Sequence, residues 1–328
     1  MLSDARAQRI LASAATSTDV RRGGNSRVTC VVEGGVEYAV KDYRQRSDGV
    51  ARLQREQMAL GFLFRHLPDA VPSPMWHSES LILAIHSWLP GTRPALDRAS
   101  VEGLLARFED LRGLMGVAEE GGVPPAVDAI RHEGELSDQI FHRCRALSAN
   151  HRLPLGPWVD EVLSGLQDQA GNRPRGEGSD RAVLTVSPSD AGPHNLLQDP
   201  LGLPYRMVDW EFFGIDDAHK LVGDSILHPQ TTWSSTLLDG FLQSSLKQFP
   251  LNLGRLERLL PLLSLKWATI ALARAARFAG ASEEAVENLD VSPSSPAGLA
   301  GRYLRLARER DLDRILALVS RSNDCASG

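Results

Sequence analysis

The chain is 328 residues long, 42% hydrophobic and 23% charged, with a formal net charge of −5. This composition is typical of folded globular proteins, and it excludes the collagen-like and disordered classes. The acidic balance also excludes the clustered basic surface with which proteins bind nucleic acids or anionic membranes. At roughly 100–200 residues per domain, the length allows two domains or one large unit.

The cysteines and the apolar segments predict a cytoplasmic protein that does not cross a membrane. Three widely separated cysteines form neither a disulfide framework nor a metal-binding CxxC pair: Cys30, Cys144 and Cys325. Residues 1–18 carry charges among small apolar residues, so they lack the continuous apolar region of a signal peptide. The most apolar later stretch, 259–273, is interrupted by Pro261 and Lys266, and we expect it to be too short and too polar to span a bilayer.

Residues 1–90 predict a helix, two strands, a second helix and a third strand. Residues 5–15 have helical composition, and 50–66 carry apolar residues at helical spacing. Between them, 27–33 and 36–43 are rich in β-branched residues and are joined by Gly34-Gly35, a pair typical of a tight hairpin. The proline-bearing segment 67–74 predicts a connection, and the apolar run 80–88 predicts a buried strand that ends at Leu89-Pro90-Gly91.

From residue 91 the pattern changes to helices. Helices are predicted over 101–114, 137–147 and 158–166; after a Gly-rich loop at 171–181, two short strands are predicted over 182–187 and 205–208. Beyond residue 232 nearly all of the chain has helical periodicity, strongest over 256–278 and 300–319. The sequence therefore predicts an α+β fold with a small β-rich N-terminal domain, residues 1–90, and a larger, mostly helical domain, residues 91–328.

Polar residues with the spacing of a phosphoryl-transfer site accompany the two short strands. Asp190 and Asn195 occupy the loop after the first strand, and Asp209 follows the second. Phosphoryl transfer uses one carboxylate to accept the proton of the attacking hydroxyl, and an amide oxygen and a second carboxylate to hold Mg²⁺. Asp190 alone is also compatible with a turn, and Asn195 with a loop cap. The order and spacing of all three residues along the sequence are typical of a kinase catalytic loop and favour a catalytic role.

The segment 187–211 resembles the aminoglycoside phosphotransferase and choline kinase family. Members commonly have His-Gly-Asp-x-x-x-x-Asn, and later Ile-Asp-Trp-Glu followed by Gly and Asp. The matching positions here are Asp190, Asn195, Val208-Asp209-Trp210-Glu211, Gly214, Asp217 and Asp224. The resemblance covers about 19–278 and implies a protein-kinase-like, two-lobed fold. It implies Asp190 as the catalytic base, Asn195 and Asp209 as metal ligands, and supporting roles for Glu211 and Asp224.

The same resemblance assigns a nucleotide site to the N-terminal domain. Lys41, in Tyr38-Ala39-Val40-Lys41, stands where a kinase-like fold has its phosphate-binding lysine, and Glu56 on the next helix would pair with it. His86 and Trp88, before Leu89-Pro90-Gly91, would line the adenine site. The loop before the first strand would approach the phosphates through its backbone N–H groups: Gly23, Gly24, Asn25 and Ser26.

One departure from the family pattern precedes Asp190. Pro188 and Ser189 stand where the family usually has His and Gly. Proline fixes φ and removes an N–H group, so this loop must be held in another way. The chain resembles a variant branch of the family in this respect, and Pro188 keeps open the alternative of an inactive kinase-like module that binds a nucleotide or serves as a scaffold.

The resemblance implies an ATP- or GTP-dependent and Mg²⁺-dependent phosphotransferase whose acceptor is a hydroxyl of a small molecule, such as a sugar, an aminoglycoside-like compound or another hydroxylated metabolite. A protein kinase is disfavoured, because no long activation segment ending in Ala-Pro-Glu follows Asp209. Acidic and basic residues are balanced beyond Phe212, and residues 300–316 bear several arginines, which favours a neutral or anionic acceptor. Transfer of AMP is a further alternative. The acceptor and the oligomeric state are not indicated by the sequence.

Overall fold

The computed structural model describes residues 2–17, 20–22, 26–149, 156–171, 181–199, 204–278, 295–309 and 311–321. The chain forms two compact units, each built from two separate stretches of sequence. The first unit comprises Met1–Val127 and Val186–Ile215, and the second comprises Asp128–Thr185 and Asp216–Gly328. The division into domains at residue 90 stays a prediction.

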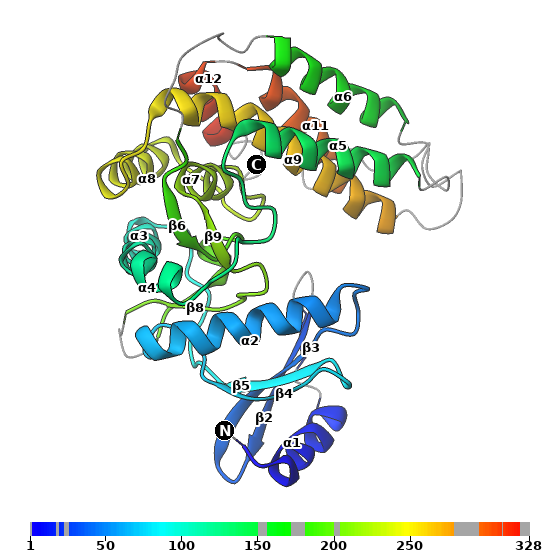
Figure 1. The fold of residues 1–328 in the computed structure, drawn as a ribbon, viewed down its shortest axis with the longest axis vertical. Helices are drawn as coiled ribbons and strands as arrows, with labels where there is room; N and C mark the ends of the chain where they lie inside the picture. Colours follow the sequence, from blue (N-terminus) through cyan, green and yellow to red (C-terminus); the bar gives the residue numbers. More distant parts are fainter. Residues whose placement is uncertain are drawn as a thin grey trace. The chain divides into compact units, whose positions relative to one another are not determined.

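A five-stranded antiparallel sheet lies in the first unit, in the order β1-β2-β3-β5-β4 (Figure 1). Its strands are β1 (Val20–Arg22), β2 (Arg27–Glu33), β3 (Val36–Asp42), β4 (Pro74–Ser78) and β5 (Leu83–Ser87). The predicted hairpin is confirmed, since β2 pairs with β3 across a turn at Gly34 and Gly35. Both glycines have positive φ, +63° and +77°, a conformation that other residues adopt only with strain.

Each side of this sheet carries a helix, because successive residues of a strand point to opposite faces. Val40 of β3 belongs to an apolar core that includes Ile10 of α1 (Asp4–Thr16). Tyr43, just after β3, packs with Leu53 of α2 (Gly49–His66). Figure 1 shows α1 and α2 on opposite sides of the sheet. Lys41 is one residue from Val40, and its side chain therefore lies on the α2 side.

The rest of the first unit contains short elements around the predicted catalytic loop. After the sheet come α3 (Arg98–Gly113) and α4 (Met115–Glu120). The 3₁₀ helix η1 (Pro193–Asn195) leads into a small hairpin of β7 (Leu196–Leu197) and β8 (Arg206–Met207). Strand β6 (Leu184–Ser187) precedes this segment and pairs with β9 (Gly214–Asp217), which follows it. The loop is therefore bounded by strand pairing at both ends.

The described part of the second unit is built mainly from helices. These are α5 (Glu133–Ser148), α6 (Gly156–Gly171), α7 (Ala218–Leu227), α8 (Ser235–Gln248), α9 (Leu253–Phe278), α11 (Pro296–Arg308) and α12 (Leu312–Arg321). Helix α9 is central, since it contacts α5, α6, α7 and α11 (Figure 1). The apolar side chains of α9, such as Leu259, Leu263 and Leu272, are buried among these neighbours.

The expectation that the apolar stretch at 259–273 is too short and too polar to span a bilayer is wrong. Helix α9 runs for 26 residues through Pro261. Within the described residues, its segment Leu253–Ala276 is long and apolar enough to cross a membrane, and 72% of its most apolar window is buried inside the protein. Burial against the other helices, and not short length, is what makes this segment a core helix.

Three other features of the secondary structure differ from the predicted elements. The region 300–319 forms two helices, α11 and α12, because the backbone becomes extended at Glu309 (φ −78°, ψ 143°). Strand β4 begins at Pro74, where the sequence favoured only a connection. Strand β9 and helix α7 lie between the predicted strand at 205–208 and the predicted helical region, where no element was expected.

Candidate active site

Lys41 is the centre of an ion-paired cluster in the first unit. Its Nζ atom lies 2.6 Å from Oε2 of Glu56, 2.7 Å from Oδ1 of Asp209 and 3.8 Å from Oε2 of Glu211. Lys41 is only 5% exposed. The structure thus brings together a lysine from β3, a glutamate from α2 and two carboxylates from the segment after β8, which are up to 170 residues apart in the chain.

The charges of this cluster stabilise one another. Burial alone would lower the pKa of the Lys41 ammonium, but the carboxylates of Asp209, Glu56 and Glu211 raise it above its ordinary value. Burial alone would raise the pKa of Glu56, but Lys41 and its hydrogen-bond donors lower it. At neutral pH the Lys41 side chain is therefore protonated and carries a positive charge, and the Glu56 side chain is ionised and carries a negative charge.

Glu56 is held by three groups. Its Oε2 atom accepts hydrogen bonds from Lys41 Nζ and, at 2.7 Å, from the hydroxyl of Tyr43. Its Oε1 atom accepts a hydrogen bond from the backbone N–H of Trp210 at 3.4 Å. This last bond ties α2 to the backbone next to Asp209. Glu56 therefore orients both the lysine and the segment that carries the second carboxylate.

The segment of Asp209 and Glu211 has a distinctive geometry. Asp209 has a positive φ of 70°, a conformation that Asn and Asp tolerate better than most residues. The Glu211 side chain is completely buried, and its Oε1 atom accepts a hydrogen bond from Arg52 Nη1 at 2.6 Å. Burial, together with the negative charges of Asp209 and Glu56, raises the pKa of Glu211 to about 7, although Lys41 and Arg52 oppose this shift.

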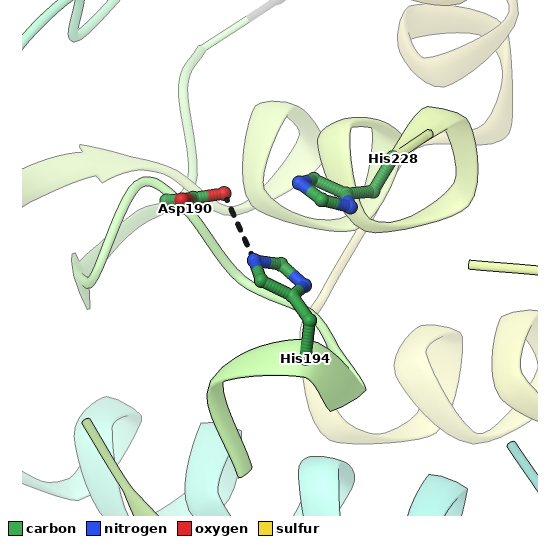
Figure 2. A group of neighbouring side chains, drawn as sticks. All are labelled: Asp190, His194 and His228. Carbon is green, nitrogen blue, oxygen red and sulfur yellow. Dashed lines mark ion pairs between the residues drawn. The ribbon is translucent and has the colours of Figure 1, made fainter. Parts of the chain in front are cut away.

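The carboxylate of Asp190 faces an imidazole. Figure 2 shows His194 directed at Asp190, and its Nε2 atom lies 3.5 Å from Oδ1 of Asp190. The Asn195 side chain donates a hydrogen bond from Nδ2 to the backbone oxygen of Asp190 at 3.0 Å. This hydrogen bond links the two residues within one turn of the chain. Because the bond uses the amide nitrogen of Asn195, the amide oxygen can still serve as a ligand.

Asn195 and Asp209 lie at the same end of the small hairpin. Leu196 pairs with Met207 in the β7–β8 ladder, and the backbone oxygen of Asn195 accepts a hydrogen bond from Val208 N–H at 3.0 Å. Antiparallel pairing therefore brings the residue before β7 next to the segment after β8. The two residues predicted to bind metal are neighbours because of this pairing.

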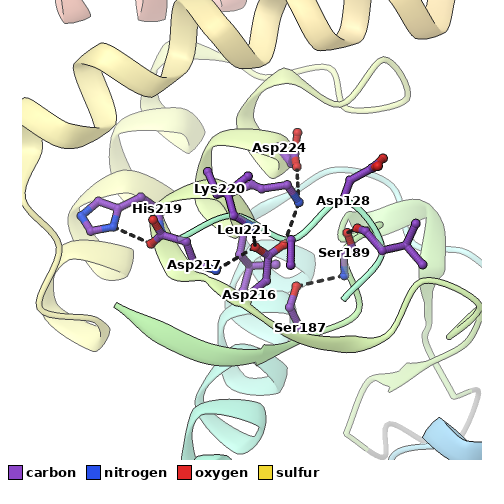
Figure 3. Close-up of polar contacts among 12 residues, drawn as sticks. Asp128, Ser187, Ser189, Asp216, Asp217, His219, Lys220, Leu221 and Asp224 are labelled. Carbon is purple, nitrogen blue, oxygen red and sulfur yellow. Dashed lines mark hydrogen bonds and ion pairs between the residues drawn. The ribbon is translucent and has the colours of Figure 1, made fainter. Parts of the chain in front are cut away.

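The turn before Asp190 is held by two hydroxyls. The Ser187 hydroxyl accepts a hydrogen bond from Ser189 N–H at 2.9 Å, as Figure 3 shows, and the Ser189 hydroxyl donates to the backbone oxygen of Val127 at 3.1 Å. Ser189 has a positive φ of 63°, the conformation in which glycine is free of strain. Ser189 thus has a glycine-like backbone, and these two hydrogen bonds hold the turn that follows Pro188.

The remaining predicted nucleotide-site residues lie at different places in the first unit. His86 is buried beneath α2, and its Nε2 atom is 2.8 Å from Nε2 of Gln57. Burial lowers its pKa to about 4, so it is neutral at pH 7. Trp88 donates its backbone N–H to Glu37 O. Ser26 is buried. Gly23, Gly24 and Asn25 lie outside the described residues.

Asp224 belongs to a buried charged network of the second unit. Figure 3 shows the Lys220 ammonium between the carboxylates of Asp216 and Asp224, at 2.7 and 3.3 Å. Asp224 also accepts hydrogen bonds from Lys266 Nζ and Trp267 Nε1. Burial alone would raise the pKa of Asp224, but Lys266 and Lys220 lower it. A bracing role for Asp224 stays a prediction.

The donor atoms of the cluster fit a divalent cation. One carboxylate oxygen from each of Glu56, Asp209 and Glu211 lies within 4.8 Å of the others. Oε2 of Glu211 is buried and makes no hydrogen bond with any described residue, so it can accept a further positive charge. Carboxylate and amide oxygens are the ligands that Mg²⁺ prefers. Glu56, Asp209 and Glu211 therefore offer suitable ligands for this ion, and the predicted ligand Asn195 lies on the segment paired with that of Asp209 and Glu211.

Sequence reasoning missed Arg52, Tyr43 and Gln57, which contact the predicted residues from α2 and the end of β3. Arg52 could have been found, because it lies four residues before Glu56, and residues at this spacing share a helix face. Nothing in the sequence pairs Arg52 with Glu211, however, since the two are 159 residues apart.

Comparisons with known proteins establish the fold. No protein-family model matches the chain, and no curated protein matches it. Among solved structures, an aminoglycoside phosphotransferase homologue from Ralstonia eutropha is 11% identical over 98% of both chains (TM-score 0.61). Choline kinase LicA from Streptococcus pneumoniae is 11% identical over 92% of this chain and 99% of its own (TM-score 0.57). A thermostable mutant of an aminoglycoside phosphotransferase, solved with ADP and hygromycin B, is 15% identical over 91% and 97% (TM-score 0.54). The predicted kinase-like α+β fold, and the resemblance at the level of fold, are confirmed.

Proposed function

We propose that this chain, which has the fold of small-molecule phosphotransferases, transfers the terminal phosphoryl group of ATP or GTP to a hydroxyl of a small molecule, with Mg²⁺. The observation that carries the proposal is the ion-paired cluster of Lys41, Glu56 and Asp209 within that fold. One solved structure with this fold holds ADP and hygromycin B, which supports a nucleotide donor and a hydroxylated acceptor.

Each residue has a role that follows from its chemistry. Lys41, oriented by Glu56, binds oxygens of the α- and β-phosphates, and its permanent charge suits this role. Asp209 and Asn195 hold the metal ion, with Glu211 beside them; bound Mg²⁺ neutralises charge on the phosphate oxygens. Asp190 accepts a hydrogen bond from the acceptor hydroxyl and orients it. It takes the proton of this hydroxyl as the oxygen bonds to the γ-phosphorus and the bond from that phosphorus to the departing nucleoside diphosphate breaks.

His194 has a supporting part in the proposed reaction. Its imidazole lies 3.5 Å from the Asp190 carboxylate. A contact of this kind restricts the rotation of the carboxylate and so helps to fix the direction from which the hydroxyl approaches. Because the transition state is loose, positioning and charge neutralisation supply most of the acceleration, and a strong base is not required.

Calorimetric titration of ATP and of GTP, with and without Mg²⁺, tests the nucleotide site. The informative variant is Asp209→Asn, because asparagine tolerates the positive φ at this position and removes only the charge. We expect magnesium-dependent binding to the wild type and its loss in Asp209→Asn. Asp42→Asn, which changes a partly buried carboxylate paired with Arg44 outside the cluster, is the matched control and should bind normally.

A second measurement separates an enzyme from an inactive module. Asp190→Asn should keep nucleotide affinity and lose phosphoryl transfer to hydroxylated acceptors, which are screened with nucleotide labelled at the γ- or the α-phosphate. Label from the γ-position on the product supports the proposal, whereas label from the α-position would indicate transfer of AMP. If neither nucleotide binds to the folded wild type, the proposal is refuted and a scaffolding role becomes the better account.

A further inference from the structure

Residues 124–127, which we call the strap, follow α4 in the first unit and lie beside the backbone that carries Asp209. The two stretches are in close contact, since a Cβ atom at Gly214 would lie 2.3 Å from Ala126 N. Their separation is therefore set by the backbone and not by intervening side chains. Three hydrogen bonds join them: Ala126 N–H to Ile215 O at 3.0 Å, Ile215 N–H to Pro124 O at 2.9 Å, and Val127 N–H to Phe212 O at 3.1 Å.

The strap also contacts the loop that carries the predicted base. The Ser189 hydroxyl donates a hydrogen bond to the backbone oxygen of Val127 at 3.1 Å. The N–H group of the same valine donates to Phe212 O. One residue of the strap thus joins the turn before Asp190 to the segment after Asp209, so the strap bridges the two segments that the proposed reaction uses.

Arg55 fastens α2 to both sides of this bridge. Its Nη1 atom donates hydrogen bonds to the backbone oxygens of Pro125 and Phe213, at 2.8 Å each. A charged donor strengthens such bonds, and a single nitrogen with two N–H groups holds both oxygens at a fixed separation. Arg55 directly precedes Glu56 in α2. The helix that orients Lys41 is therefore tied, by the neighbouring residue, to the strap and to the segment after Asp209.

The turn 210–213, which begins directly after Asp209, is held to α2 chiefly at its end. Glu56 also binds the backbone of this turn, at its first residue, but the distance of 3.4 Å is long for such a bond. The bonds of Arg55 are shorter, and they reach the last residue of the turn and the strap. Because a backbone contact fixes the course of the chain, Arg55 controls how far Asp209 lies from Lys41.

We propose that Arg55 is a positioning residue, which holds the turn after Asp209 at the distance from α2 at which Lys41 and Asp209 act on the same nucleotide. The proposal rests on the proposed function, since that function gives the two residues their ligand. Arg55 itself contacts neither nucleotide nor acceptor. Asp209 takes part in binding through the metal ion, so a displaced Asp209 weakens the part of the affinity that Mg²⁺ adds and leaves the part that Lys41 supplies.

The first test measures the affinity for ATP and for GTP by calorimetry, with and without Mg²⁺, and checks folding by circular dichroism. We expect Arg55→Met to reduce the gain in affinity that Mg²⁺ gives by roughly tenfold, and to leave the metal-free affinity unchanged. Arg55→Lys should recover most of the loss, because an ammonium nitrogen also carries enough N–H groups for both oxygens. Arg65→Met is the matched control and should change neither affinity, since Arg65 Nε binds only Gly61 O of its own helix.

Three outcomes of this test would overturn the proposal. The first is an unchanged gain from Mg²⁺ in Arg55→Met, because the other contacts of α2 would then hold the turn without Arg55. The second is an equal loss of affinity with and without Mg²⁺, which a general disturbance of the first unit would produce. The third is a lysine variant that binds as weakly as Arg55→Met, since the two carbonyl bonds would then not be what the arginine supplies.

The second test needs no nucleotide. In protein labelled with ¹⁵N-tryptophan, the backbone amide resonance of Trp210, assigned by comparison with Trp210→Phe, reports the bond from this N–H group to Glu56. It should shift in Arg55→Met and keep its position in Arg65→Met. The amide resonance of Trp233, in the second unit, should stay constant in both variants. An unchanged Trp210 resonance in Arg55→Met would overturn the proposal.

The two tests separate the inference from the function on which it rests. A wild type that binds neither nucleotide refutes the proposed function, and the Trp210 resonance still decides whether Arg55 holds the turn. A wild type that binds nucleotide with Mg²⁺, and an Arg55→Met variant that binds it equally well, supports the function and overturns the inference.

Discussion

At position 189 we expect the Ser189→Gly variant to be more stable than the Ser189→Ala variant. This is the reverse of the order usual within a helix or strand, where alanine is the more stabilising residue. Ser189 has a φ of +63°, and its hydroxyl donates a hydrogen bond to the backbone oxygen of Val127. Both substitutions lose this bond, which contributes about 1 kcal/mol. Only glycine escapes the cost of the left-handed backbone, roughly 1–2 kcal/mol, and it loses about 0.5–1 kcal/mol through the greater freedom of the unfolded chain.

The difference works out at roughly 1 kcal/mol in favour of Ser189→Gly over Ser189→Ala. The assay is urea denaturation followed by both tryptophan fluorescence and circular dichroism, with equal m-values for the compared variants. Ser13, an exposed residue inside α1, is the control position, and there alanine should be more stable than glycine by about 1 kcal/mol. If the Ser189→Ala variant is as stable as the Ser189→Gly variant, or more stable, the left-handed backbone at this turn does not carry the expected energetic cost and the reasoning is refuted.

Three further predictions concern stability, measured in the same way. Asp217→Asn should cost about 3 kcal/mol, because it leaves Arg255, whose Nε lies 2.9 Å from Asp217 Oδ2, as a buried cation without a carboxylate; a loss below about 1 kcal/mol would contradict this. The pKa of His86 is lowered to about 4, so the unfolded chain takes up its proton first. Stability should therefore fall by up to about 3 kcal/mol as pH drops from about 6.5 to 4, and His86→Gln should lose this dependence. Gly214→Ala should destabilise by about 1–3 kcal/mol, because its Cβ would lie 2.3 Å from Ala126 N, whereas Gly61→Ala in α2 meets no atom within 4 Å and should stabilise by about 1 kcal/mol.

Local patterns were enough to predict the elements that form the base of the first unit. The hairpin of β2 and β3 and the helix α2 were predicted because β-branched runs, a Gly-Gly turn and apolar residues at helical spacing are signals within one short segment. Strand β4 was missed, since Pro-Met-Trp-His-Ser shows no alternation and becomes a strand only by pairing with β5. The break between α11 and α12 was missed because periodicity continues across it.

The sequence predicted only those site residues that belong to motifs with a characteristic spacing. The contacts of Lys41 with Glu56 and Asp209 match the kinase-like order of these residues in the sequence. The role of each residue stays a prediction. The bond between Arg52 and Glu211, by contrast, joins residues that no local pattern connects, and it depends on where the fold places the backbone after Asp209. The positive φ of Ser189 could not be predicted either, because serine seldom adopts this conformation.

The discontinuous first unit has a consequence for synthesis of the protein on the ribosome. Lys41 emerges 168 residues before Asp209, and translation at about 5–20 residues per second separates them by roughly 10–30 s. In that interval the stretch 128–185 of the second unit is made, before the last part of the first unit exists. The stretches of the two units are therefore synthesised in an interleaved order, and the first unit cannot be completed before residue 215 is made. In stalled nascent chains, full protease resistance of residues 27–66 should appear only after residue 215 has left the exit tunnel.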